Sequence, residues 1–293
     1  MTQGSTPAGE PAGAGSQQPP PRPPPWWRTL RADPPAHLRF ALGAAMVGLI
    51  LFAWWLLTRG EATEAIVSPG RLPSPSGVFG STGKLVENDL ETHIWATMKR
   101  ILTGVSAAAV FGVALGVLAS SYRAVAAALT PVVVFLRSIP MGALFPLVLL
   151  IAVGDAEKQK TTFVFLAVVP FIFSDTFASI ASVPQRYVET AQTLGASRFQ
   201  IIRKVLFPIA LPDIITGLRF QFGLALGYIM LVETNEMQQG GLGALLWSTQ
   251  RSYAADSMER VYMLLFVITA IAFALDHLIR FFQRGFFPYR SDL

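Results

Sequence analysis

The sequence predicts an all-α membrane protein with about six transmembrane helices. Of its 293 residues, 52% are hydrophobic and only 14% are charged, and the mean hydropathy is +0.48. An ordinary soluble domain carries about 25% charged residues, so this chain is too apolar for that class. Six apolar segments come close to or exceed the roughly 20 residues that a helix needs to cross a 30 Å hydrocarbon core.

Composition also excludes several kinds of site. The chain has no cysteine, which removes disulfides, thiolate nucleophiles and cysteine–metal clusters. His37, His93 and His277 lie far apart without ligand spacing, so we expect no metal site. We find no G-x-x-x-x-G-K-[ST] phosphate loop and no catalytic constellation, and therefore expect no catalytic residue, no cofactor bound by this chain and no enzyme activity. The net charge of +5 comes from basic residues that flank apolar segments, so we expect no nucleic-acid partner.

Residues 1–36 form the first predicted region, a proline-rich tail that contains P-P-P-R-P-P-P. Such a composition cannot bury a core, which predicts disorder or an extended polyproline path. The predicted membrane domain covers 37–283, and 284–293 is a short C-terminal tail.

The first predicted span is 38–57, with Arg39 at its edge as its one charge. Residues 59–91 form a polar connection whose L-P-S-P-S-G-V-F segment favours an extended, turning path. The second span centres on 101–121 and carries no charge. Its Gly112 and Gly116 form a G-x-x-x-G pair, which permits close helix approach either within one chain or at a dimer face.

The third span, 124–154, contains Pro131, Pro140 and Pro146, which predict a bent or broken helix. The fourth span is 161–183. A fifth span, 214–232, and a sixth, 258–282, follow after a polar interruption at 184–212.

The polar interruption at 184–212 predicts two short helices around one glycine. Gly195 suits the left-handed position after a helix, and Ser197 with Gln200 has the spacing of a capping box at the start of the next helix. Phe199, Ile202 and Leu206 would form one apolar stripe on that second helix. A compact helix–turn–helix between membrane spans is typical of a docking element, so we name 184–212 the docking loop.

Several charges fall inside the predicted spans, where each costs about 2.5–3.5 kcal/mol and needs a partner or a wet cavity. We expect Arg137, Asp175 and Glu233 to line or gate a translocation path. A structural alternative is that Arg137 and Asp175 pair and hold spans three and four together. Arg219 and Asp276 are interpreted as interfacial anchors. Arg100, in a T-x-x-R segment, is interpreted as a side chain that snorkels to the outer interface, and attraction of an anion is the alternative.

The distribution of lysine and arginine predicts the orientation in the membrane. The side with the docking loop and both termini carries twelve, and the opposite loops carry six. The twelve are Arg22, Arg28, Arg31, Arg39, Arg123, Arg186, Arg198, Arg203, Lys204, Arg280, Arg284 and Arg290, and the six are Arg59, Arg71, Lys84, Lys158, Lys160 and Arg251. This asymmetry predicts a multi-pass protein whose docking loop and termini are cytoplasmic.

The docking loop resembles the EAA loop of bacterial ABC-importer permeases. The resemblance rests on Glu189-Thr-Ala191, then Gly195-Ala196, then Pro208 and Pro212, with Thr190 departing from the usual alanine. Further segments are similar to the nitrate/sulfonate/taurine-type branch of these permeases and extend the resemblance over about 72–250. They are L-P-S-P-S-G-V-F, T-M-K-R-I-L-T-G-V, R-S-I-P-x-x-A-L-F-P-L, and V-E followed by G-L-G.

The resemblance implies a type I ABC-importer permease (MetI-like) architecture in the bacterial cytoplasmic (inner) membrane. It implies a path for a small solute, such as nitrate, bicarbonate or a sulfonate, that a periplasmic or lipid-anchored solute-binding protein delivers. Two P-loop ATPase subunits, which bind ATP and Mg, would grip the docking loop, with Glu189 making a cap or ion pair there or with the partner. A second permease copy is also implied, a homodimer being favoured over a heterodimer. The alternative is an ion-gradient-driven secondary transporter or channel.

Overall fold

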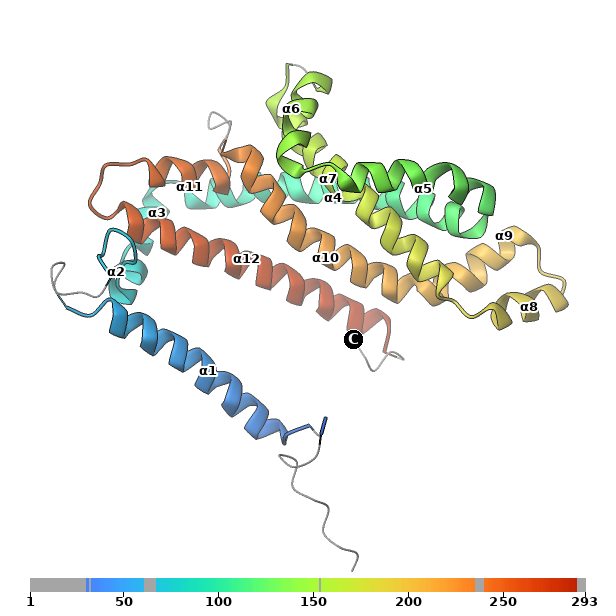
Figure 1. The fold of residues 1–293 in the computed structure, drawn as a ribbon, viewed down its shortest axis with the longest axis horizontal. Helices are drawn as coiled ribbons and strands as arrows, with labels where there is room; N and C mark the ends of the chain where they lie inside the picture. Colours follow the sequence, from blue (N-terminus) through green and yellow to red (C-terminus); the bar gives the residue numbers. More distant parts are fainter. Residues whose placement is uncertain (1–29, 32, 61–66, 153, 235–239, 289–293) are drawn as a thin grey trace, which may run out of the picture. The chain divides into compact units, whose positions relative to one another are not determined.

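The structure is a computed structural model that describes residues 30–31, 33–60, 67–152, 154–234 and 240–288. These residues form helices and connections, without a β-strand (Figure 1). Most of the expected N-terminal tail, and the end of the C-terminal tail, lie outside the described residues. The helices are α1 (Ala36–Leu57), α2 (Pro75–Gly80), α3 (Thr82–Glu87), α4 (Leu90–Ser121), α5 (Arg123–Ser138), α6 (Met141–Ile151), α7 (Ala156–Ala181), α8 (Gln185–Thr193), α9 (Arg198–Ile201), the π-helix η2 (Ile202–Leu206), α10 (Phe207–Glu233), α11 (Leu242–Gln250) and α12 (Ser257–Phe286).

The chain divides into two compact units, Met1–Trp54 and Trp55–Leu293. The described part of the first unit is dominated by α1, whose 22 residues have a mean hydropathy of 2.2 and are long enough to cross a bilayer. The second unit contains all the other helices and every residue of the sites discussed below.

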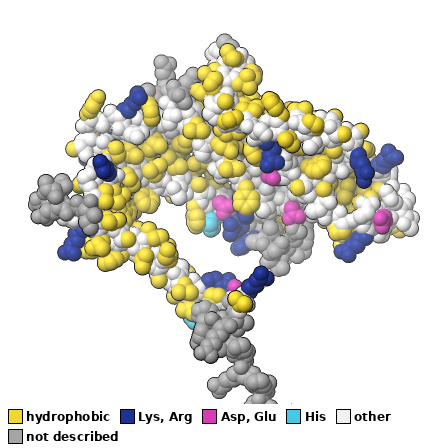
Figure 2. Space-filling model, viewed as in Figure 1, with side chains coloured by type: hydrophobic (Ala, Val, Ile, Leu, Met, Phe, Trp, Pro, Cys, Tyr) yellow, Lys and Arg dark blue, Asp and Glu magenta, His cyan; other side chains and the backbone are white. Residues whose placement is uncertain are grey.

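The number of spans agrees with the prediction. Five helices of the described residues are long and apolar enough to cross a membrane, and a sixth span is formed if α5 and α6 count as one. These two helices meet at an angle of 108°. The break lies at Ile139–Pro140, whereas Pro131 and Pro146 lie inside their helices. The third span is therefore broken, as its prolines predicted. Hydrophobic side chains cover much of the visible helical surface, as expected for a protein in contact with lipid (Figure 2).

Helices α4, α7 and α10 form the core of the second unit. Close approach of α4 and α7 depends on the absence of a side chain at Gly112 and Gly116. A Cβ at Gly112 would lie 2.8 Å from Ile172 Cγ2, and one at Gly116 would lie 2.8 Å from Thr176 Cβ. The G-x-x-x-G pair of the second span is therefore used within one chain, which decides between the two alternatives left open by the sequence.

Short helices replace two stretches that were predicted as connections. The 59–91 connection contains α2 and α3, so its path is not extended as expected. Ser74 caps α2 by accepting a hydrogen bond from Gly77 N, and Pro75 suits the first helical turn, where no N–H is needed. Between the fifth and sixth spans, α11 begins at Leu242, inside the G-G-L-G segment at 240–243. Helices of six to nine residues leave too few positions for a periodic pattern to be recognised.

Candidate functional site

The docking loop begins with Pro184, which is followed by α8, and Gly195 lies directly after Leu194, the C-cap of this helix. Gly195 has φ +81°, the left-handed conformation that its position predicted. Gly195 N donates to Gln192 O at 2.9 Å and Ala196 N donates to Ala191 O at 3.0 Å, which is the Schellman pattern of helix ends. Space is not the constraint here, because a Cβ at Gly195 would meet no atom within 4 Å. The backbone conformation is what requires glycine.

The second half of the docking loop begins with the predicted capping box. Gln200 N donates to Ser197 Oγ at 3.4 Å, and Ser197 N donates to Gln200 Oε1 at 2.8 Å. The helix does not stop at the prolines, however. It runs through α9, η2 and α10 as one apolar helix from Arg198 to Glu233. The second short helix of the docking loop is therefore continuous with the fifth span, which was expected to begin separately at 214.

The π-helix explains how the chain accommodates both prolines within a helix. Phe207 N bonds to Ile202 O, five residues back, which shifts the hydrogen-bond pattern just before Pro208. Pro208 directly follows this shift and has no N–H to donate, so it lies where the regular helical hydrogen-bond pattern is already interrupted. The carbonyl of Pro212 accepts from Gln283 Nε2 of α12 at 2.9 Å, which anchors this part of α10.

The docking loop presents apolar side chains on its surface. Tyr187, Leu194 and Phe199 are exposed, Leu194 by 82% and Phe199 by 67%, whereas Ala191 and Ile201 are buried. Of the expected apolar stripe, Phe199 is exposed and Ile202 and Leu206 are half-buried, and the π-helix over Ile202–Leu206 changes the helical period along it. Exposed apolar groups on a polar element are typical of a protein-binding surface.

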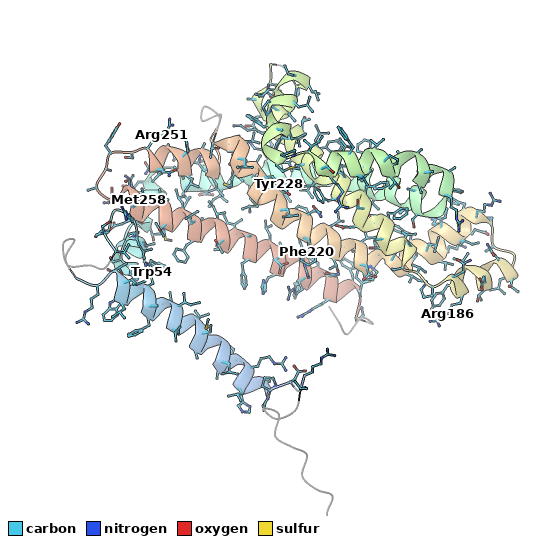
Figure 3. The ribbon with its side chains drawn as sticks, in the orientation of Figure 1. Trp54, Arg186, Phe220, Tyr228, Arg251 and Met258 are labelled. Atoms are coloured by element: carbon cyan, nitrogen blue, oxygen red, sulfur yellow. The ribbon has the colours of Figure 1, made fainter. Side chains whose placement is uncertain are left out.

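Other predicted residues of the docking loop are accessible as well. Glu189 and Pro208 are exposed, and Ala196 is half-buried. Among the described residues, no ion pair or hydrogen bond reaches the Glu189 carboxylate. A hollow of about 210 Å³ separates α8 and α9 from the end of α4 at Ser121 and Tyr122. Figure 3 places Arg186 of α8 at one end of the second unit and Arg251, which follows α11, at the other.

Arg137 and Asp175 have different partners. The Arg137 guanidinium lies over the Phe171 ring, with Cζ 4.9 Å from the centroid. Asp175 Oδ2 instead accepts from Gln221 Nε2 of α10 at 3.1 Å. The ion pair suggested as an alternative is therefore absent. Phe171 and Asp175 are four residues apart on α7, so both charges face the same side of that helix.

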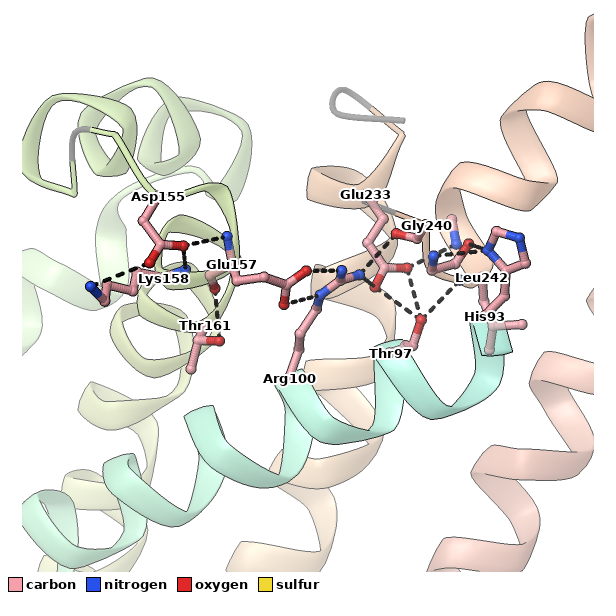
Figure 4. A network of polar contacts seen from close by, with 12 residues as sticks. His93, Thr97, Arg100, Asp155, Glu157, Lys158, Thr161, Glu233, Gly240 and Leu242 are labelled. Carbon is pink, nitrogen blue, oxygen red and sulfur yellow. Dashed lines mark hydrogen bonds and ion pairs between the residues drawn. The ribbon is translucent and has the colours of Figure 1, made fainter. Parts of the chain in front are cut away.

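Glu233, the third residue expected on the path, is completely buried at the end of α10. Its Oε1 accepts from Arg100 Nη1 at 2.7 Å and from Thr97 Oγ1 at 2.9 Å, and its Oε2 accepts from Gly243 N at 2.9 Å (Figure 4). The glycines of G-G-L-G make room for this carboxylate. A Cβ at Gly241 would lie 2.4 Å from Glu233 Cδ.

Arg100 is the residue that the sequence interpretation placed wrongly. Its side chain is 1% exposed instead of snorkelling. Nε donates to Glu157 Oε2 at 2.9 Å, Nη2 pairs with Glu157 Oε1, and Nη1 also donates to Gly240 O at 2.9 Å. Arg100 therefore joins α4 to the start of α7, the end of α10 and the segment just before α11. Thr97, three residues before Arg100 in the T-x-x-R segment, was a sequence signal for this polar site. The acidic partners of Arg100 lie far away in the sequence and gave no such signal.

The polar groups of α10 and α12 also contact one another. Arg219 Nε lies 3.0 Å from Asp276 Oδ1, and Arg280 Nη2 donates to Asp276 Oδ2 at 3.1 Å. Arg219 and Asp276 are thus partners across two helices. The described residues contain no group of three or more His, Cys, Asp or Glu side chains able to hold a metal ion.

Comparisons with known proteins agree on one kind of protein. Residues 108–288 match the family model described as binding-protein-dependent transport system inner membrane component. The chain is 31% identical to the taurine transport system permease protein TauC of Escherichia coli (strain K12), over 91% of this chain and 96% of that protein. It is 30% identical to the nitrate import permease protein NrtB of Synechocystis sp. (82% and 86%), and 28% identical to the bicarbonate transport system permease protein CmpB of Synechococcus elongatus (82% and 87%).

Solved structures support the fold. The MetNI methionine ABC transporter in an inward-facing conformation has a chain that is 25% identical, with a TM-score of 0.52 over 64% of this chain and 93% of that one. A chain from the crystal structure of an amino acid ABC transporter with histidines is 16% identical, with a TM-score of 0.58 over 69% of this chain and 97% of that one.

Proposed function

Since the chain belongs to the family of binding-protein-dependent transport system inner membrane components, we propose that it forms the translocation path of an ATP-driven importer for a small oxyanion. In this proposal an external binding protein delivers the solute, and two P-loop ATPase subunits bind the docking loop. The similarity to permeases for taurine, nitrate and bicarbonate supports the substrate class, because each of these solutes carries a compact group of oxygen atoms.

The geometry of the docking loop is the observation that carries the proposal. Leu194 and Phe199 are exposed on either side of a turn that a Schellman motif and a capping box hold in one conformation. A rigid apolar projection of this kind fits a cleft on another protein. An isolated chain in water would gain nothing from exposing these groups.

The long helix that follows the docking loop can transmit a movement of the loop to distant residues. It continues from Arg198 to Glu233 over 36 residues, or about 54 Å at 1.5 Å per residue. A displacement of the docking loop by ATPase closure would therefore move Glu233 and the helix ends that Arg100 joins. We propose that Glu233 influences the path in this indirect way, through the position of α10.

Asp175 and Arg137 are proposed to line the path. Asp175 belongs to α7, and Arg137 of α5 lies against the same face of that helix. Neither has an oppositely charged partner within 4 Å among the described residues. Helix α5, which carries Arg137, has no buried residue in the single chain and exposes Val132, Val134 and Phe135. We propose that a second copy of the chain covers this surface, so that a homodimer encloses the path.

The excess of lysine and arginine on the docking-loop side, twelve against six, supports a cytoplasmic docking loop and cytoplasmic termini in the inner membrane. This is the side on which ATP is available.

Co-purification in mild detergent from the native organism tests the proposal. We expect a P-loop ATPase to accompany the wild type and to be lost with Gly195→Val, because a β-branched residue is strongly disfavoured at positive φ. Gly154→Val is the matched control, since Gly154 also has positive φ (+91°) and open surroundings but lies before α7, away from the docking loop. Retention of the ATPase by both variants, or its absence from the wild type, would contradict coupling through this loop and favour an ion-driven transporter.

A further inference from the structure

A cavity of about 530 Å³ opens beside Arg100, at the end of the second unit that lies away from the docking loop. Glu157, on its wall, is in the first turn of α7, and the other end of α7 leads into α8. The 26 residues of α7 separate the cavity from the docking loop by about 39 Å. The cavity is lined by Lys99, Arg100, Thr103, Ile151, Ala152, Glu157, Lys158, Thr161 and Thr162.

The lining of this cavity is cationic. It contains three basic side chains, Lys99, Arg100 and Lys158, and a single carboxylate, that of Glu157. Lys99 is exposed, and its ammonium has no ion-pair partner among the described residues. Within the described part of the chain, Lys158 pairs only with Asp155, at 3.3 Å, and its side chain is 79% exposed. Asp155 and Glu233, which lie outside the lining, neutralise Lys158 and the Nη1 edge of Arg100. Lys99 is therefore the cation that attracts an anion here, together with the Nε/Nη2 edge of Arg100 when Glu157 leaves it.

The two carboxylates on Arg100 are held very differently. Glu233 is fully buried and accepts from Thr97, Arg100 and Gly243, which fixes it in place. Glu157 is 49% exposed, and its carboxylate accepts hydrogen bonds only from Arg100 among the described residues. Replacing Glu233 would leave several buried donors without an acceptor. Glu157 can instead return to water when another acceptor takes its place.

Glu157 occupies the edge of Arg100 that recognises oxyanions. Its two oxygens take the Nε and Nη2 donors, while Glu233 and Gly240 use Nη1 (Figure 4). Two parallel N–H donors of a guanidinium bind any group with two oxygens in the spacing of a carboxylate. Nitrate, bicarbonate and sulfonate groups all present such a pair.

We propose that this cavity is an oxyanion-binding site, in which a small oxyanion displaces Glu157 from the Nε/Nη2 edge of Arg100 and is held by Lys99. Glu157 serves as a built-in substitute that keeps Arg100 paired while the site is empty. The inference rests on the proposed function for its solute class, since the same oxyanions would arrive here before entering the path. No residue of the docking loop takes part in it.

The melting temperature of the purified complex in lipid nanodiscs, without ATP, measures binding. Sodium nitrate, sodium bicarbonate and taurine are titrated separately, with sodium chloride at equal ionic strength as the reference. We expect a saturable rise in melting temperature with at least one oxyanion and none with chloride. Lys99→Gln should weaken the apparent affinity about tenfold, and Glu157→Gln should strengthen it about tenfold because the competing carboxylate is gone. Arg251→Gln is the matched control and should bind as the wild type does, since Arg251 stacks on Trp247 outside the cavity.

Equal effects of chloride and the oxyanions would overturn the site, as would unchanged affinity in both Lys99→Gln and Glu157→Gln. If Glu157→Gln lowers the melting temperature without changing its dependence on oxyanion concentration, the ion pair is only structural and the inference is wrong. The outcome is separable from that of the proposed function. A complex that contains the ATPase but shows no saturable oxyanion effect contradicts the site alone, and a chain that binds oxyanion without an ATPase contradicts the coupling alone.

Discussion

The guanidinium of Arg100 and the carboxylate of Glu233 form an ion pair at 2.7 Å in which the side chains are 1% and 0% exposed. One lies in α4 and the other at the end of α10, and the same guanidinium also holds Glu157 of α7. Three helices of the core thus meet at one cation. Because burial removes the water that would otherwise solvate both charges, each depends on the other.

Loss of the cation should therefore be costly. Arg100→Met leaves Glu233 buried without its countercharge, and we expect a loss of about 3–5 kcal/mol in the free energy of unfolding. Chemical denaturation of the detergent-solubilised protein measures this. The double variant Arg100→Met/Glu233→Met should recover part of the loss, because no buried charge remains.

Lys84→Met is the matched control for Arg100→Met. Lys84 pairs with Asp256 at 2.7 Å, but its side chain is 61% exposed, so water replaces the partner. We expect little change in stability. A loss as large as that of Arg100→Met, or an undiminished loss in the double variant, would contradict the importance of burial.

The lack of space for a side chain at Gly241 leads to a second prediction. Gly241 has φ +117°, and a Cβ there would lie 2.4 Å from Glu233 Cδ. Gly241→Ala must therefore strain the backbone and displace the carboxylate, at a cost of at least about 1–3 kcal/mol. Gly227→Ala, inside α10 with no atom within 4 Å of the added Cβ, should be neutral or stabilise the helix by up to about 1 kcal/mol. Similar melting temperatures for the two variants would contradict the close packing around Glu233.

The pair between Lys84 and Asp256 predicts a dependence on pH. The Lys84 ammonium, which donates to Asp256, lowers the pKa of this carboxyl below its ordinary value. A lowered pKa in the folded state means that the pair stabilises the protein above the unfolded pKa of about 3.9 and loses this effect as pH falls through the folded value. The difference in melting temperature between wild type and Asp256→Asn should be small, because the Lys84 side chain is exposed, constant from about pH 7 to 5, and lost as pH falls through the lowered folded pKa. A difference that grows on acidification would show that the sign is wrong.

The sequence predicted the features that depend on neighbouring residues. Gly195 and the Ser197–Gln200 box were identified because a helix cap is decided within about one turn. The spans were recognised because their hydrophobicity is continuous, and the broken third span because proline interrupts it.

The features that depend on distant residues were not predictable from the sequence. Arg100 was expected to snorkel, but Glu157 and Glu233, which make its burial possible, are 57 and 133 residues away. Arg137 and Asp175 seemed a natural pair by charge. The way α5 and α10 pack against α7 prevents this pairing, because it places Phe171 against Arg137 and Gln221 against Asp175. No local pattern encodes such packing.

Asp175 provides a test of both the path and the kind of solute. Asp175→Asn removes the charge but keeps an oxygen that can accept from Gln221 Nε2, so the contact between α7 and α10 should persist. If the side chain lines the path, it repels an anion and attracts the ammonium of a zwitterion such as taurine. We therefore expect Asp175→Asn to lower the transport KM for nitrate or bicarbonate and to raise it for taurine, by about tenfold in either case. Arg137→Gln should shift each value in the opposite direction.

Ser174→Ala is the control, since the Ser174 hydroxyl bonds within its own helix to Pro170 O at 2.8 Å. Uptake into vesicles that contain the complete complex measures these values, and unchanged KM in both charge variants would place Asp175 and Arg137 away from the path.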